Sequence, residues 1–169
     1  MRAALIFTGH LRGTCDRDQD AGLRTLQAQA DNCRAAFPIC DVFIHTWDWL
    51  DKPPLKFKER RRRPKKKCGF DCRTALKLNG SSWSCVARVV AALNPVAVTV
   101  ERQDRLPTYD SDARLWNSVE TLRSFRMNGA SMSGGSDLVR RHALTMNHTY
   151  AAAIRMRADV GSPNIDLRG

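Results

Sequence analysis

The chain has 169 residues, of which 43% are hydrophobic and 27% are charged. These proportions are typical of one globular domain with its own core, and they exclude a chain that is disordered throughout. No apolar run reaches the roughly 18 residues that a membrane-spanning helix needs. The short apolar run after Met1 and Arg2 ends in polar residues, so we do not expect it to be a secretory signal.

The net charge of +11 is concentrated in one segment. Residues 52–77 contain twelve Lys and Arg against two acidic residues, whereas the rest of the chain contains sixteen basic and fifteen acidic residues. The centre of the segment, Arg60–Lys67, has seven basic side chains that repel one another, and Pro64 interrupts any helix. We expect a basic, solvated and partly disordered insertion at about residues 51–82. The alternative is a tract that binds a polyanion such as nucleic acid.

The first part of the chain predicts a strand, a helix and a second strand. Residues 3–8 and 41–46 are apolar runs of strand length. Between them, residues 19–36 have apolar side chains at spacings of three and four, which indicates an amphipathic helix. A unit of this length is typical of a right-handed crossover between parallel strands.

The alternation of helices and strands resumes after the insertion. We expect a helix at 83–93 ending at Asn94 and Pro95, a strand at 96–100, a helix at 115–126, a Gly- and Ser-rich break at 128–135, a helix from Ser136 to about Asn147, and a strand at 150–157. This order predicts a single α/β domain over residues 1–169, a three-layer sandwich around a mostly parallel sheet.

The six cysteines leave several interpretations open. Unpaired thiols are the default, whereas a disulfide among Cys68, Cys72 and Cys85 would need an oxidising compartment. A zinc site there would have to recruit His45 or His142 from far away in the sequence. The two Asn-x-Ser/Thr tripeptides of the chain would be glycosylation acceptors only in a secretory lumen.

Three apolar runs end in clusters of Gly, His, Arg, Trp or Asp, as parallel strands do when they present polar residues to a ligand cleft. The first cluster lies in residues 4–13 (ALIFTGHLRG). Gly9 and Gly13 would let the backbone approach a phosphate, and the guanidinium of Arg12 could bind a diphosphate. The alternative is a plain tight turn.

The second cluster ends residues 41–48 (DVFIHTWD). After His45, the ring of Trp47 offers a flat face for a base or a sugar, and Asp48 could accept hydrogen bonds from hydroxyl groups. The alternative is a buried tryptophan followed by an aspartate that caps a helix. Glu101 ends the third strand in a similar way, although we favour its pairing with a surface arginine.

The third cluster is residues 154–159 (IRMRAD). Because side chains alternate along a strand, we expect Arg155, Arg157 and Asp159 on one face of a central strand. Two cations and a carboxylate there are costly unless they pair with each other or with a ligand. Asp159 could hold a divalent cation that bridges a diphosphate, and the alternative is a structural Arg–Asp network.

Taken in order, these motifs resemble a glycosyltransferase-like family whose members occur in bacterial polysaccharide loci and in algae. The similar segments are residues 7–12, residues 41–48, Asn94-Pro95 before a strand that ends in Glu101, Ser131-Met132 before a helix, Tyr150, and residues 154–159. The resemblance covers nearly all of the chain apart from the insertion, and the His-Thr-Trp-Asp run is its most specific part.

The resemblance implies a Rossmann-like fold of the GT-A type. In such a protein a UDP- or GDP-linked sugar binds, and the sugar is transferred to a hydroxyl group of a glycan or another acceptor. The resemblance implies a Mn²⁺ or Mg²⁺ ion on Asp159 and assigns no catalytic residue. The donor-binding residues that it implies are Gly9, Arg12, His45, Trp47, Asp48, Arg155 and Arg157.

The chain departs from the pattern of the family at four points. Arg157 and Ala158 precede Asp159, so the first aspartate of an Asp-x-Asp motif is missing. Ser133-Gly134-Gly135 replace an aromatic residue, and Ala151 replaces an acidic one. The chain ends ten residues after Asp159, so we expect an incomplete, donor-binding domain or an inactive homologue. From this sequence we expect the chain in the cytoplasm, or in the Golgi lumen if an anchor precedes it.

Overall fold

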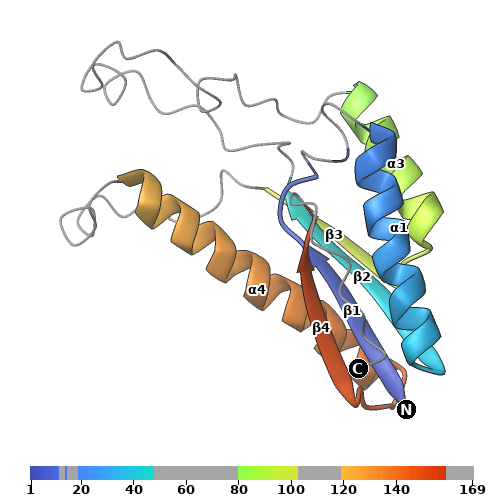
Figure 1. The fold of residues 1–169 in the computed structure, drawn as a ribbon. Helices are drawn as coiled ribbons and strands as arrows, with labels where there is room; N and C mark the ends of the chain where they lie inside the picture. Colours follow the sequence, from blue (N-terminus) through green and yellow to red (C-terminus); the bar gives the residue numbers. More distant parts are fainter. Residues whose placement is uncertain (12–13, 15–18, 48–79, 103–118, 159–169) are drawn as a thin grey trace, which may run out of the picture.

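The computed structural model describes residues 1–11, 14, 19–47, 80–102 and 119–158, which form an α/β fold (Figure 1). The elements in chain order are β1 (Arg2–Thr8), α1 (Gln19–Ala36), β2 (Ile39–Trp47), α3 (Gly80–Leu93), β3 (Ala97–Glu101), α4 (Val119–Thr145) and β4 (Ala152–Arg157). The predicted α/β class with a parallel sheet is therefore confirmed. Residues 51–79 of the predicted basic insertion lie outside the described residues, and its last three residues, 80–82, belong to α3 instead.

The four described strands form one parallel sheet in the order β3-β2-β1-β4. Thr8 at the end of β1 is in register with His45 of β2 and Arg157 of β4, and Trp47 is in register with Glu101 of β3. The carboxyl ends of all four strands therefore meet at one edge. The strand predicted at 150–157 was expected to be central, and this is wrong among the described strands, because β4 lies at the edge of their sheet.

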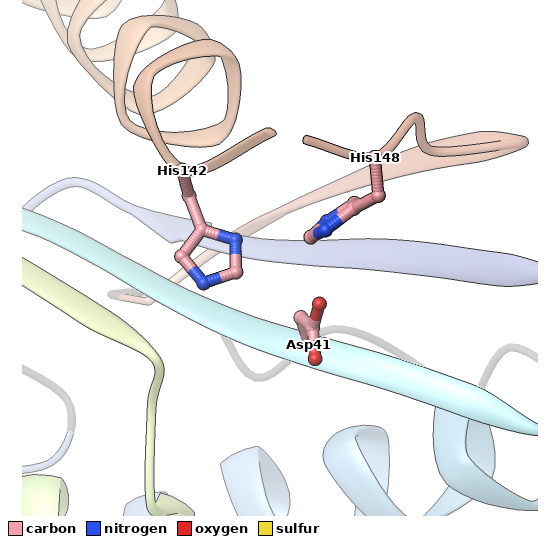
Figure 2. Close-up of side chains that lie close together, drawn as sticks. All are labelled: Asp41, His142 and His148. Carbon is pink, nitrogen blue, oxygen red and sulfur yellow. The ribbon is translucent and has the colours of Figure 1, made fainter. Parts of the chain in front are cut away.

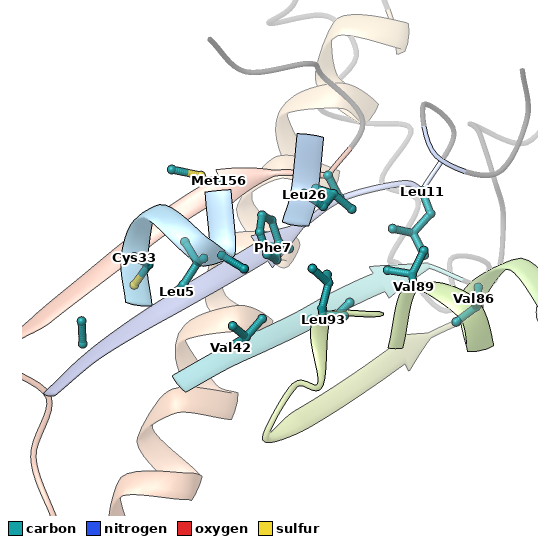
Figure 3. Packing of buried hydrophobic residues seen from close by; sticks show 14 residues of the cluster. Leu5, Phe7, Leu11, Leu26, Cys33, Val42, Val86, Val89, Leu93 and Met156 are labelled. Atoms are coloured by element: carbon teal, nitrogen blue, oxygen red, sulfur yellow. The ribbon is translucent and has the colours of Figure 1, made fainter. Parts of the chain in front are cut away.

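Helices α1 and α3 cover one face of the sheet, and α4 covers the other (Figure 1). The larger core lies under α1 and α3 (Figure 3). Alternate strand residues such as Leu5, Phe7 and Val42 point into it, and α1 and α3 contribute Leu26 and Leu93. These side chains are almost completely buried, which removes apolar surface from water and supplies most of the driving force for this layer.

A smaller core fills the space between the sheet and α4. It consists of Ala4 and Ile6 of β1, Phe43 of β2, and Leu138 and Val139 of α4. Because successive side chains of a strand point to opposite faces, β1 and β2 contribute to both cores. The three-layer arrangement thus follows from strands that are apolar on both sides, as buried parallel strands are.

The predicted break at residues 128–135 does not exist, because α4 is one helix from Val119 to Thr145. Ser136 does not begin a new helix, and its hydroxyl donates to the carbonyl of Met132 within α4. A Cβ at Gly134 would overlap the ring of His45, and one at Gly135 would lie 2.9 Å from Cγ2 of Ile6. These glycines therefore let α4 pack directly on the sheet, which outweighs their poor helix propensity.

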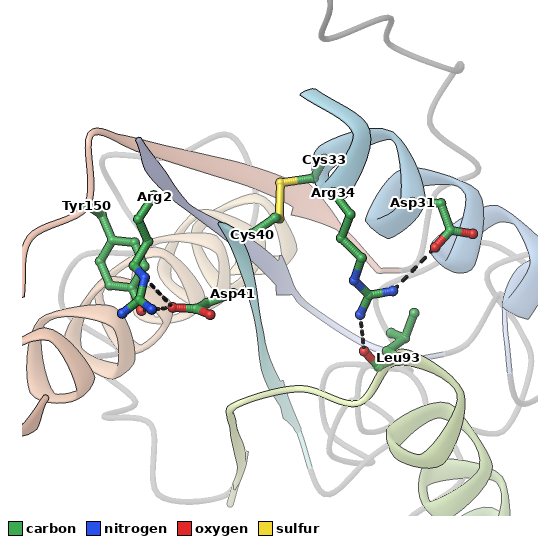
Figure 4. The surroundings of a disulfide bond; sticks show 8 residues. All are labelled: Arg2, Asp31, Cys33, Arg34, Cys40, Asp41, Leu93 and Tyr150. Atoms are coloured by element: carbon green, nitrogen blue, oxygen red, sulfur yellow. Dashed lines mark hydrogen bonds and ion pairs between the residues drawn. A yellow bond between two sulfur atoms is a disulfide. The ribbon is translucent and has the colours of Figure 1, made fainter. Parts of the chain in front are cut away.

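A disulfide joins Cys33 near the end of α1 to Cys40 at the start of β2 (Figure 4). The expectation of unpaired thiols is wrong for this pair. Next to it, the guanidinium of Arg34 donates to the carbonyl of Leu93 at 2.8 Å and so links α1 to the end of α3. The other four cysteines lie outside the described side chains.

Two of the three described helices, α3 and α4, are followed by asparagines with left-handed backbone. Asn94 follows α3 with φ 46°, and Asn147 lies two residues after α4 with φ 50°. Asparagine tolerates this conformation better than most residues, which ends the helix and redirects the chain toward the next strand. The predicted stop at Asn94 is confirmed. None of the described helices is long and apolar enough to cross a membrane.

Candidate functional site

The strand order creates a point at which the chain connections diverge, between β1 and β4. From β1 the chain proceeds through α1 and α3 to β2 and β3 on one side, and β4 lies on the other side after α4 has crossed the opposite face. In parallel α/β sheets, ligands bind at the carboxyl ends of the strands beside such a switch point. The described residues that end β1, β2 and β4, and that begin or carry the three predicted motif clusters, lie at this edge.

Gly9 is the first residue after β1 and has φ 103°, a conformation that favours glycine. Its N–H donates to the carbonyl of His45 at 3.1 Å, and the N–H of Ala158 donates to the carbonyl of Thr8 at 2.9 Å. These bonds hold the backbone of β1, β2 and β4 together at the switch point. The neighbouring Leu11 is buried in the larger core, and Arg12 lies outside the described residues.

Arg155 and Arg157 extend from the same face of β4, while Met156 between them is buried in the opposite direction. The predicted alternation of this strand is therefore confirmed. The Nε–H of Arg155 donates to the hydroxyl oxygen of Thr8 at 2.9 Å, which fixes its guanidinium over β1. Both arginines are exposed, so their charge can reach a ligand at this edge. Asp159 lies outside the described residues.

His45 lies beneath Gly134 of α4, and both His45 and Trp47 are almost completely buried, with exposed fractions of 0% and 1%. Their rings meet edge to face, with centroids 5.5 Å apart. The ring of Trp47 is therefore covered in this structure, which agrees with the alternative interpretation of a buried tryptophan. Contact of Trp47 with a base or sugar remains a prediction, and Asp48 lies outside the described residues.

Glu101 approaches His45 from β3 at the same edge. Its Oε1 lies 3.3 Å from Nε2 of His45, within ion-pair distance but without the geometry of a hydrogen bond. The sequence favoured Arg102 or Arg105 as the partner of Glu101. Arg105 lies outside the described residues, and among the described ones the carboxylate of Glu101 approaches the buried imidazole. An acidic group is thereby added to the edge that carries Arg155 and Arg157.

Several buried polar atoms at the end of β2 find no hydrogen-bond partner within the described part of the chain. They include both ring nitrogens of His45, Oγ1 of Thr46 and Nε1 of Trp47. A buried polar group without a partner costs about 1–3 kcal/mol, and such groups in proteins call for a water, an ion or a ligand. These atoms extend the candidate site beneath α4.

A second polar cluster, which the sequence did not predict as a site, lies at the opposite, amino ends of the strands (Figure 2). It contains Asp41 of β2, His142 near the end of α4, and His148 in the turn that follows, with Arg2 and Tyr150 beside them. His142, His148 and Tyr150 are close in sequence, whereas Arg2 and Asp41 are more than one hundred residues away from them. Only the pairing of β1 with β2 and the position of α4 on the sheet bring these two groups together, so the sequence pattern alone does not reveal the cluster.

Comparisons with protein families, with curated proteins and with solved structures find no match to this chain. The fold class is thus established by the structure alone.

Proposed function

We propose that this chain binds a nucleotide-diphosphate sugar at the carboxyl ends of β1 and β4 and acts as the donor-binding part of a glycosyltransferase-like protein. The observation that carries the proposal is the meeting of Gly9, Arg155 and Arg157 at the switch point of the sheet. The choice of a nucleotide sugar as the ligand rests on the order of the sequence motifs and on their resemblance to a glycosyltransferase-like family.

The chemistry of this edge suits a diphosphate. Guanidinium groups form charge-assisted hydrogen bonds to phosphate oxygens, and a glycine turn lets backbone N–H groups approach them. In sugar transfer the leaving diphosphate gains negative charge, so the arginines would stabilise the transition state more than the bound donor. Glu101 and the buried donors of His45 and Trp47 would serve the uncharged hydroxyl and base groups of the ligand.

Asp159 is the residue that would hold Mn²⁺ or Mg²⁺, which in such a site neutralises the diphosphate. The sequence offers no second aspartate two positions before it, since that position is Arg157. We therefore propose that Arg157 takes over part of the charge neutralisation, and that donor binding depends only weakly on the metal.

Titration calorimetry with UDP- and GDP-sugars, with and without Mn²⁺, tests the proposal. We expect saturable binding of one class of nucleotide sugar, and a roughly tenfold loss of affinity in both Arg157→Gln and Arg12→Gln, because each charge-assisted hydrogen bond contributes about 1.5–3 kcal/mol. Arg141→Gln is the matched control, since the side chain of Arg141 is exposed on α4 and donates to the carbonyl of Asp137 in the same helix.

The proposal fails if no nucleotide sugar binds to the folded chain, or if Arg141→Gln weakens binding as much as Arg157→Gln. Transfer itself is a separate question. Hydrolysis or transfer of the sugar, followed by release of the nucleoside diphosphate, would distinguish an active protein from an inactive homologue that still binds the donor.

A further inference from the structure

The cluster at the amino ends of the strands gathers three metal-ligating side chains from three segments of the chain. Asp41 comes from β2, His142 from α4, and His148 from the turn before β4 (Figure 2). One ligand atom of each lies within 4.8 Å of the others. All three residues are partly buried, neither fully exposed nor closed off from solvent.

Two imidazoles and a carboxylate are a donor set that suits Zn²⁺ and related transition metals, whereas Mg²⁺ and Ca²⁺ prefer oxygen ligands. Around a tetrahedral Zn²⁺ with bonds of about 2.1 Å, ligand atoms are about 3.4 Å apart. The distances between the three ligand atoms must therefore shorten by little more than an ångström, which side-chain rotation can provide. The fourth coordination position would be taken by water or by Tyr150.

The cluster already holds a positive charge. The guanidinium of Arg2 lies 2.7 Å from Nδ1 of His148, and its Nε lies 3.6 Å from Oδ2 of Asp41. A cationic group thus bridges the same imidazole and carboxylate that would ligate a metal. The side chain of Arg2 is 29% exposed at the start of β1, so it can swing into water when an ion takes its place.

Tyr150 and Phe43 hold the ligands in orientation. The hydroxyl of Tyr150 donates to Oδ2 of Asp41 at 2.7 Å and lies 2.8 Å from Nδ1 of His142. Phe43 packs edge to face against both His142 and Tyr150, with centroids 5.5 and 5.9 Å apart. Outer contacts of this kind orient metal ligands in known sites and strengthen binding.

We propose that Asp41, His142 and His148 form a Zn²⁺-binding site at the amino ends of the strands, in which the metal replaces the guanidinium of Arg2. The site lies at the opposite end of the sheet from Gly9 and Arg157, and it does not depend on the proposed function. By linking β2, the end of α4 and the turn before β4, a bound ion would fix α4 to the sheet.

Competition between the full chain, freed of metal with a chelator, and a chromophoric zinc indicator tests the site. We expect Zn²⁺ to bind and Mg²⁺ not to bind, and the affinity for Zn²⁺ to fall by at least about tenfold in His142→Ala and in His148→Gln. Asp41→Asn should also lose affinity. Asp137→Asn is the matched control, because this exposed aspartate on α4 lies outside the cluster.

Two further measurements separate this site from cysteine ligands elsewhere and from loss of folding. Co²⁺ bound at His and Asp should show d–d absorption without the thiolate charge-transfer band that cysteine ligands give. Arg2→Gln keeps all three ligands and should bind Zn²⁺ more tightly, since the competing cation is removed. A purely structural network predicts no gain. Equal Zn²⁺ affinity in the wild type and in His142→Ala, or no gain in Arg2→Gln, would overturn the proposal.

Discussion

At Gly134 the backbone of α4 comes so close to β2 that no side chain fits. The ring of His45 occupies the place that a Cβ would take, and at Gly135 the methyl group of Ile6 does the same. Gly129 lies in the same helix but has nothing within 4 Å of its would-be Cβ. Substitution at Gly134 therefore tests close packing, whereas substitution at Gly129 tests only the low helix propensity of glycine.

Gly134→Ala should lower the free energy of unfolding by about 1–3 kcal/mol, because the new methyl group must push His45 or the helix away. Gly129→Ala is the matched control and should raise the same quantity by about 0.5–1 kcal/mol, since alanine is the better helix former and meets no neighbour. Urea denaturation of the two variants and the wild type measures both effects. Equal stability of the two variants would contradict the close packing of α4.

The same residues show why part of the fold could not be read from the sequence. A run of Gly and Ser at 128–135 favours a break by local propensity, and tertiary packing on β1 and β2 decides instead for a continuous helix. Trp47 also has two consistent interpretations in the sequence. In the folded chain its ring is buried and packs edge to face against His45.

At the scale of elements, the first strand–helix–strand unit is the best predicted part of the chain. The helix was expected at 19–36 and is found at Gln19–Ala36, because its apolar spacing and the following proline define it locally. The disulfide across the turn after α1 was not foreseen, since spacing alone does not reveal which cysteines pair. Cys33 is fully buried in the larger core, whereas Cys40 lies at its margin.

This disulfide should contribute about 2–3 kcal/mol to the free energy of unfolding, because it closes a short loop in the unfolded chain and so lowers its entropy. We expect dithiothreitol to lower the urea midpoint of the wild type. The double variant Cys33→Ala/Cys40→Ala should resemble the reduced wild type, and the reductant should have little further effect on it. Were the oxidised and reduced wild type to unfold at the same urea concentration, the stabilising role of this bond would be excluded.

At the scale of the whole molecule, α4 covers a sheet face whose two ends differ in chemistry. The carboxyl end carries Gly9, Arg155 and Arg157, and the amino end carries the cluster around Asp41 and His142. The first was predictable, because polar residues that follow apolar runs gather at the carboxyl edge of a parallel sheet. The second was not, because its residues meet only through strand register and the length of α4.

The excess positive charge of the molecule lies in the basic segment and not at the proposed donor site, so the two can be tested independently. Outside residues 52–77 the chain is nearly neutral, so binding to a polyanion should depend on the seven basic residues of Arg60–Lys67. Replacing these seven by Gln should weaken binding of a single-stranded oligonucleotide and flatten its salt dependence, by about 0.7 in log–log slope for each lost phosphate contact. Affinity for the nucleotide sugar should stay unchanged.

Gln replacement of Arg140 and Arg141, exposed on α4, is the control. An unchanged salt slope in the seven-residue variant would show that the polyanion binds elsewhere on the molecule, and a parallel loss of nucleotide-sugar affinity would show that the two sites are not independent.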